Sequence, residues 1–190
     1  MKVRSDLPQW LVDNGLVVGA EIGVYKGEFT EIFCKVGIKM IYAIDPWKAY
    51  PIKEKYKDVD NVTQERQDFL CTHAHRTLDK YPNCTIIKKT SKDALEDFED
   101  ESLDFVYIDG DHSFPSVAFD IFEWSRKVKK GGVVSGHDYT SIPIYGAQVK
   151  PVVDAFVESF GIKTFQEIGT KSKADTKRRG DGYYSWMFIK

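Results

Sequence analysis

The chain has 190 residues, of which 42% are hydrophobic, so it is long and apolar enough to bury a core and is not disordered. Its 27 Lys and Arg residues nearly balance 29 Asp and Glu residues, which argues against a general nucleic-acid or membrane-surface binder. No apolar run approaches the roughly 18 residues that span a bilayer. The first residues lack the apolar stretch of a signal peptide, and the three cysteines show no C-x-x-C spacing, so we expect a cytoplasmic protein.

Short β-branched runs alternate with longer helical patterns, which is typical of a doubly wound α/β fold. Helices are predicted at residues 6–14, 28–36, 61–81, from Ser91, 117–128 and 149–160. Strands are predicted at residues 16–22, 39–44, 84–88, 103–108, 133–135, 162–168 and 183–189. Asn61 and Gln64 resemble a capping box, and Gly131-Gly132 is interpreted as the stop of the helix at 117–128. No repeat or linker interrupts the chain, so we expect a single domain over residues 1–190, and the last two strands, which lack a crossover helix, should be antiparallel.

In open α/β sheets, ligands bind beyond the carboxyl ends of the strands. Polar residues gather at these positions here: residues 21–27 after the first strand, Asp45 after the second, residues 109–112 after the fourth, and His137 with Asp138 after the fifth. This shared position indicates one site built from several strand ends.

The glycines of the first turn do not match the G-x-G-x-x-G pattern that binds a dinucleotide. Glu21 would repel a diphosphate and suits an ammonium or sulfonium cation, while Gly23 lets the backbone approach a ligand closely. Asp45 follows at about the 20-residue offset at which an acidic residue meets ribose hydroxyls. A nucleoside with an amino-acid tail fits these features, and S-adenosylmethionine is such a molecule. The alternative is that the glycines serve only a tight turn and helix packing.

Four segments, EIGVYKGEFT, YAIDPW, DFVYIDGDHSFPSVAFDI and VKKGGVVSGHDY, resemble the successive motifs of class I S-adenosylmethionine-dependent methyltransferases. The closest resemblance is to the small-molecule and sugar O-methyltransferases of macrolide biosynthesis, and it covers about residues 19–160. It implies a Rossmann-like sheet of seven mostly parallel strands, the last antiparallel, with helices on both faces. It also implies methyl transfer from S-adenosylmethionine to a hydroxyl oxygen of a small-molecule acceptor.

The resemblance implies that the cofactor is bound by residues at the strand ends, namely Glu21, Gly23, Tyr25, Gly27, Asp45, Trp47, Ser91 and Asp109. Glu21, Gly23 and Gly27 would contact the methionine portion, and Asp45 would hold the ribose with Trp47 beside it. Ser91 is either near the adenine or the N-cap of the helix that it opens.

A second group of candidates lies at the fourth and fifth strand ends. In related metal-dependent O-methyltransferases the metal ligands occupy the positions of Asp109, His137 and Asp138, and the middle position is usually acidic. We expect a divalent ion such as Mg²⁺ or Mn²⁺, although an imidazole at position 137 favours softer ions. His112 is the candidate catalytic base, acting with Asp109. Asp111 has a plain alternative as a cap of the following helix, and the whole group has an alternative as a metal-free site.

Two rival functions remain open. His112, His137 and one carboxylate would also fit a non-haem metal-dependent oxygenase, and the same fold can serve as a non-catalytic cofactor-binding module. We expect a small-molecule partner, no nucleic acid and no membrane, and we leave a homo-oligomer open. The basic run at 171–179 is either a solvated surface or a lid over an anionic acceptor.

Overall fold

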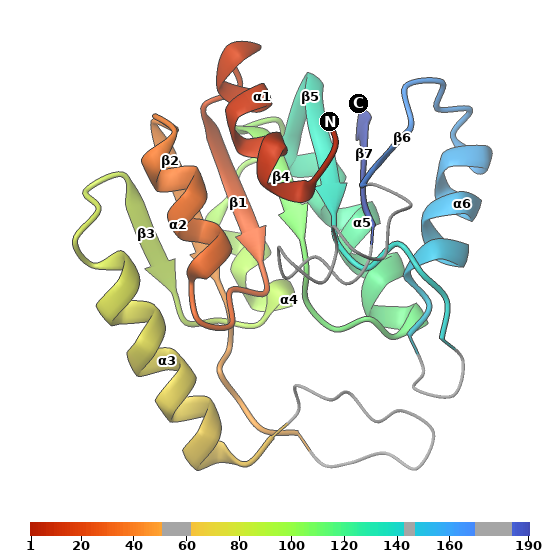
Figure 1. Cartoon of the computed structure of the whole chain (residues 1–190). Coiled ribbons are helices and arrows are strands. Elements are labelled where there is room, and N and C mark those ends of the chain that lie inside the picture. Colours follow the sequence, from red (N-terminus) through yellow and green to blue (C-terminus); the bar gives the residue numbers. More distant parts are fainter. Residues whose placement is uncertain (51–61, 143–146, 170–183) are drawn as a thin grey trace.

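Seven strands form one sheet in the order β3-β2-β1-β4-β5-β7-β6 in the computed structural model, which describes residues 1–50, 62–142, 147–169 and 184–190 (Figure 1). The strands are β1 (Val18–Ile22), β2 (Met40–Ile44), β3 (Cys84–Ile87), β4 (Leu103–Ile108), β5 (Val128–Gly136), β6 (Gln166–Ile168) and β7 (Ser185–Ile189). β7 runs antiparallel to both of its neighbours, and the other neighbouring pairs are parallel. The predicted fold class is therefore confirmed.

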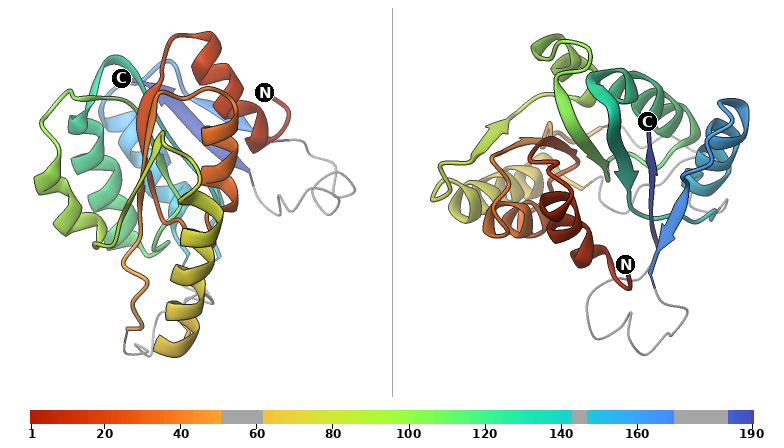
Figure 2. Two further views of the ribbon diagram at one scale, coloured as in Figure 1. Left: turned by 90° about the vertical axis from the view of Figure 1, so that its left-hand side faces the viewer. Right: turned by 90° about the horizontal axis from the view of Figure 1, so that it is seen from above.

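Helices cover both faces of the sheet (Figure 2). They are α1 (Leu7–Asp13), α2 (Glu28–Lys35), α3 (Gln64–Leu78), α4 (Ser91–Ala94), α5 (Phe114–Lys127) and α6 (Val149–Ser159). α1, α2 and α3 bury apolar side chains such as Phe33 and Leu70 against one face. α4, α5 and α6 bury Trp124 and Val153 against the other. Because both faces of the sheet are covered by apolar cores, the positions that remain for polar site residues of the central strands are the strand ends.

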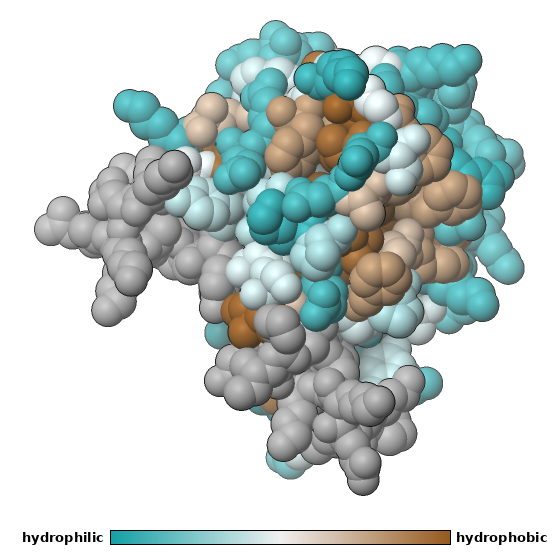
Figure 3. Space-filling view, turned by 90° about the vertical axis from the view of Figure 1, so that its right-hand side faces the viewer, coloured by the Kyte–Doolittle hydropathy of each residue, from teal (hydrophilic) through white to brown (hydrophobic). Residues whose placement is uncertain are grey.

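Apolar side chains also reach the surface beside α6. Figure 3 shows hydrophobic residues among hydrophilic ones on the side that α6 and β6 face. Phe160, which follows α6, is 60% exposed, and its ring packs on Phe156 with the ring centroids 4.4 Å apart. None of the helices in the described ranges is long and apolar enough to cross a membrane.

The helix predicted at 61–81 is shorter in the structure. It begins at Gln64, because the Thr63 hydroxyl accepts a hydrogen bond from the backbone N–H of Arg66 and caps the helix, and it ends at Leu78. Asn61, the cap expected from the sequence, lies outside the described residues. Residues 51–61 and the basic run at 171–179 also lie outside the described residues.

The interpretation of Gly131-Gly132 as a helix stop is wrong. α5 ends at Lys127, and Val128, which continues the helical apolar spacing, is already the first residue of β5. The β4–β5 register shifts between Leu103 and Phe105, and the two glycines lie in this irregularity. A Cβ on Gly132 would lie 2.5 Å from the carbonyl oxygen of Asp104, so the strands approach too closely there for a larger residue.

The central strands end at one level. Ile22 is in register with Ile44 and with Ile108, and Ile108 with Gly136. The hydrogen bonding between strands continues one residue beyond these pairs. The backbone N–H groups that make these additional bonds belong to Gly23, Asp45, Asp109 and His137, and they donate to the carbonyl oxygens of Ile44, Ile87, Ile22 and Ile108, respectively. The parallel register therefore places four predicted site residues along one edge.

Gly23 has φ +90°, and a Cβ there would lie 2.1 Å from the carbonyl oxygen of Asp109. Gly23→Ala therefore combines backbone strain with a clash between two strand ends, and we expect it to lower the free energy of unfolding by about 3 kcal/mol. Urea unfolding checks this. Gly37→Ala is the matched control, because Gly37 has φ +92° with open space around it, and strain alone should cost about 1 kcal/mol. Equal losses in both variants would contradict the proposed clash.

Candidate active site

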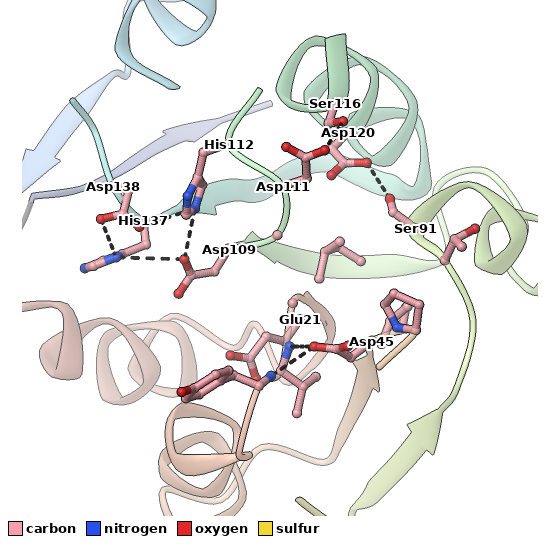
Figure 4. A pocket seen from close by; sticks show the side chains of 18 of the residues that line it. Glu21, Asp45, Ser91, Asp109, Asp111, His112, Ser116, Asp120, His137 and Asp138 are labelled. Carbon is pink, nitrogen blue, oxygen red and sulfur yellow. Dashed lines mark hydrogen bonds and ion pairs between the residues drawn. The ribbon is translucent and has the colours of Figure 1, made fainter. Parts of the chain in front are cut away.

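A cavity of about 1070 Å³ opens at the carboxyl ends of the central strands (Figure 4). Most of the predicted site residues line it: Glu21, Gly23, Tyr25, Asp45, Ser91, Asp109, His112, His137 and Asp138. Gly27 and Trp47 do not. Gly27 is the N-cap of α2 at φ +79°, and Trp47 is 1% exposed and donates from Nε1 to the carbonyl oxygen of Tyr25. These two residues therefore support the turn that follows β1 without lining the cavity.

Glu21 lies near the end of β1 with 1% of its surface exposed. Its carboxylate accepts a hydrogen bond from the hydroxyl of Thr30 on α2. Burial raises the pKa of Glu21 to about 8, although the Thr30 hydrogen bond works in the opposite direction. A cation entering the cavity would stabilise the ionised form, so Glu21 suits a positively charged ligand.

Asp45 holds the first turn in place. One carboxylate oxygen accepts from the N–H groups of Val24 and Tyr25 at 2.9 and 3.0 Å, and the other accepts from Trp47 N–H at 2.7 Å. Burial raises the pKa of Asp45, and these three hydrogen bonds oppose the rise. Tyr25 and Trp47 have φ of +54° and +41°, in the left-handed region. Asp45 thus stabilises a strained turn, and the prediction that it also holds the ribose remains a prediction.

Two carboxylates and two imidazoles converge at the ends of β4 and β5 (Figure 4). Nδ1 of His137 lies 3.3 Å from Asp138 Oδ1 and 3.8 Å from Asp109 Oδ1. Nε2 of His112 lies 3.3 Å from Asp138 Oδ2 and 3.6 Å from Asp109 Oδ1. Asp109, His137 and Asp138 each offer a ligand atom within 4.8 Å of the others.

This donor set fits a divalent cation. Nδ1 of His137 faces both carboxylates, so one nitrogen atom and two carboxylate oxygens point to one place. Asp138 has φ +48°, a strained conformation at the same position. Two oxygen ligands and one nitrogen ligand suit Mn²⁺ and related ions.

Positive groups keep Asp109 ionised. Burial alone would raise its pKa, but the nearby imidazoles of His112 and His137 and the guanidinium of Arg4 outweigh burial, so the pKa lies below its usual range. Nη1 of Arg4 is 3.3 Å from Asp109 Oδ2, and the guanidinium carbon lies 4.5 Å from the centre of the Phe29 ring. Arg4 could not be predicted from the sequence, because it precedes the first strand and reaches the site only through folding.

Ser91 is not the N-cap of α4. That cap is Thr90, whose hydroxyl accepts a hydrogen bond from Asp93 N–H. The Ser91 hydroxyl instead donates to Asp120 Oδ1 and accepts from Trp124 Nε1 at 2.8 Å. Asp120 was not among the candidates, although a charged residue on the apolar face of a helix, beside Ile121 and Trp124, was a visible signal.

Asp111 supports the start of the following helix, which was the alternative to a role in the metal site. Its two oxygens accept hydrogen bonds from the backbone N–H of Ser113 and from the hydroxyl of Ser116, both at 2.8 Å. Ser113 is the N-cap of α5, so Asp111 stabilises the start of that helix.

Comparison with known proteins gives one family match, in which the model of a methyltransferase domain family fits residues 20–139. A relative from Sinorhizobium fredii, the uncharacterized protein y4gI, is 38% identical over 53 residues. That match covers 28% of this chain and 6% of the relative, so this chain aligns with only a small part of that protein.

Solved structures resemble this fold over nearly its whole length. The O-methyltransferase NovP matches with a TM-score of 0.64 and 17% identity, covering 98% of this chain and 79% of NovP. The O-methyltransferase from Bacillus cereus in complex with SAH matches with a TM-score of 0.61 and 16% identity, covering 98% and 80%. At these identities the likeness confirms the fold.

The raised pKa of Glu21 predicts a pH-dependent stability. The folded state holds this proton more tightly than the unfolded state, so the stabilisation is complete below about pH 4.5 and is lost as the pH rises towards 8. Glu21→Gln removes the titration. The free energy of unfolding of the variant minus that of the wild type should therefore increase by on the order of 3 kcal/mol from pH 5 to pH 8. Chemical denaturation at both pH values measures this difference. The exposed Glu65→Gln serves as the control, and a Glu21→Gln profile parallel to the wild type would contradict the assignment.

Proposed function

Because the chain belongs to the methyltransferase domain family, we propose that it transfers the methyl group of S-adenosylmethionine to a hydroxyl oxygen of a small-molecule acceptor. The prediction of a class I S-adenosylmethionine-dependent methyltransferase is confirmed for family and fold. One observation supports the proposal further: the turn around Gly23, with the buried Glu21 beside it, lines the same cavity as the cluster of carboxylates and imidazoles. The methyl donor and the methyl acceptor can therefore meet in one place.

The turn around Gly23 is the proposed site of the cofactor's amino-acid end. Glu21 would face the ammonium or sulfonium charge, which compensates for its costly ionisation in a buried position. Asp45 would meet the ribose, and because it already fixes the turn, cofactor binding needs little rearrangement there. A turn fixed before binding lowers the entropy that the complex loses.

Asp109, His137 and Asp138 are the proposed ligands of a divalent ion, Mg²⁺ or Mn²⁺. Such an ion supplies positive charge that lowers the pKa of a nearby hydroxyl and orients it. His112 is the proposed base. Its ring is held by Asp109 and Asp138, so Nε2 lies where it can accept the proton that the acceptor hydroxyl loses.

The rival functions have less support. His112, His137 and Asp109 do come together, as an oxygenase site would require, but the chain belongs to a methyltransferase family. A binding module without activity would not need the carboxylates and imidazoles beside the cofactor turn. We also propose a cytoplasmic location, because the three cysteines show no C-x-x-C spacing, and a small-molecule partner without nucleic acid, because the charges nearly balance.

The cofactor proposal predicts that the protein binds S-adenosylhomocysteine and not NAD. Glu21 beside the turn would repel the diphosphate of NAD, whereas it would attract the amino-acid end of the homocysteine product. Isothermal titration calorimetry with each ligand is the test. Tighter binding of NAD would rule out the assignment.

The metal proposal predicts that the protein binds Mn²⁺ and that Asp138→Asn weakens this binding at least about tenfold. Asn is well suited to the left-handed backbone at position 138, so the variant should fold, and its affinity for S-adenosylhomocysteine should change little. Titration followed by the electron paramagnetic resonance of free Mn²⁺ gives the affinity. Asp79→Asn, at an exposed position on the far end of α3, is the control. Equal Mn²⁺ affinity in the wild type and Asp138→Asn would exclude this centre.

A further inference from the structure

Asp120 is a buried carboxyl group that the proposed chemistry does not use. It lies on the face of α5 that packs against the sheet, with Ile121 and Trp124 beside it, and only 4% of its surface is exposed. Burial raises the pKa of Asp120 to about 7, the nearby charge of Asp111 adds to the rise, and the Ser91 hydrogen bond opposes it. A carboxyl group at such a position is unfavourable unless partners satisfy it.

Only one of its two oxygens is satisfied. Oδ1 accepts the hydrogen bond from the Ser91 hydroxyl, and Ser91 is in turn fixed by Trp124 Nε1. Oδ2 has no donor among the described residues. It lies near Gly110, which follows β4, because a Cβ on that glycine would be 3.9 Å from it. Asp120, Ser91 and Gly110 all line the cavity.

The position of this oxygen within the cavity limits what it can meet. Figure 4 shows Asp120 and Ser91 at one end, the group of Asp109, His137 and Asp138 at the other, and Glu21 and Asp45 along the side between them. In the proposed function, on which this inference rests, the reacting methyl group must lie near the Asp109 end. The base of the nucleoside then extends past Asp45 towards Asp120.

We propose that Oδ2 of Asp120 accepts a hydrogen bond from the exocyclic amine of the adenine base, so that Asp120 selects adenine at this site. Adenine carries an amine at this ring position, whereas hypoxanthine and guanine carry a carbonyl oxygen, which a carboxylate oxygen repels. Ser91 acts as a positioning residue, since its hydroxyl hydrogen is already donated to Asp120. A buried acceptor that only the right base can satisfy discriminates strongly against analogues without the donor.

A comparison of two ligands on two proteins tests the contact. Calorimetry above pH 7, where Asp120 is ionised, would measure the affinities of S-adenosylhomocysteine and its 6-oxo analogue, S-inosylhomocysteine, for the wild type and for Asp120→Asn. The wild type should prefer the adenosyl compound by about 10- to 100-fold. In Asp120→Asn the preference should fall at least about fivefold, because a carboxamide can turn its N–H₂ group towards the carbonyl oxygen.

Asp111→Asn is the matched control, because Asp111 is a neighbouring carboxylate at the cavity whose oxygens are bound by Ser113 and Ser116. It should keep the wild-type preference. An unchanged preference in Asp120→Asn, or an equal fall in Asp111→Asn, would overturn the role of Asp120. If the wild type binds neither ligand, the proposed function itself is wrong, which is a separate result.

One measurement does not depend on the stability of a variant. The wild type should bind the analogue that has hydrogen in place of the amine about tenfold or more weakly than S-adenosylhomocysteine. Equal affinity for these two compounds would show that no hydrogen bond to the amine forms, and would overturn the proposal.

Discussion

Parallel pairing requires neighbouring strands to end on the same side of the sheet, but it does not by itself require them to end at the same level. Here Ile22 is in register with Ile44 on one side and with Ile108 on the other, and Ile108 is in register with Gly136. Each following residue continues the ladder by one backbone hydrogen bond. The side chains at positions 45, 109 and 137 are therefore anchored by rigid strands and not by loops, which gives a site the precision that group transfer needs.

The same alignment brings carboxyl groups into low-dielectric surroundings, where their neighbours decide their charge. Glu21 and Asp120 are each hydrogen-bonded to one hydroxyl group, and burial raises the pKa of both. Asp109 is also buried, but two imidazoles and a guanidinium hold its pKa below the usual range. Glu21, Asp120 and Asp109 thus have three different environments in the cavity, which suit a ligand cation, a neutral hydrogen-bond donor and a metal ion respectively.

Much of this site could be predicted from the sequence, because the alternation of strand and helix patterns locates the strand ends. Glu21, Asp45, Asp109, His112 and the pair at 137–138 follow directly from that rule, and all of them line the cavity. Arg4 and Asp120 did not follow from it, since each reaches the cavity through tertiary packing. The wrong helix stop at Gly131-Gly132 has a similar origin, because the apolar spacing of α5 continues to Val128 although the backbone there has already become a strand.

Arg4 bears on how the proposed metal centre can form. A cation bound to Asp109 need not compete with the guanidinium, because the two carboxylate oxygens have different partners. Oδ2 faces Arg4, whereas Oδ1 faces His112 and His137. Oδ1 of Asp138 lies 3.3 Å from Nδ1 of His137, the same nitrogen that Oδ1 of Asp109 faces. An ion held by Asp109, His137 and Asp138 would therefore bind Oδ1 of Asp109 and leave the contact between Arg4 and Oδ2 intact. Arg4 then fixes the orientation of the carboxylate, in the way that hydrogen-bonded neighbours orient metal ligands elsewhere, and links the first residues of the chain to the reacting end of the cavity.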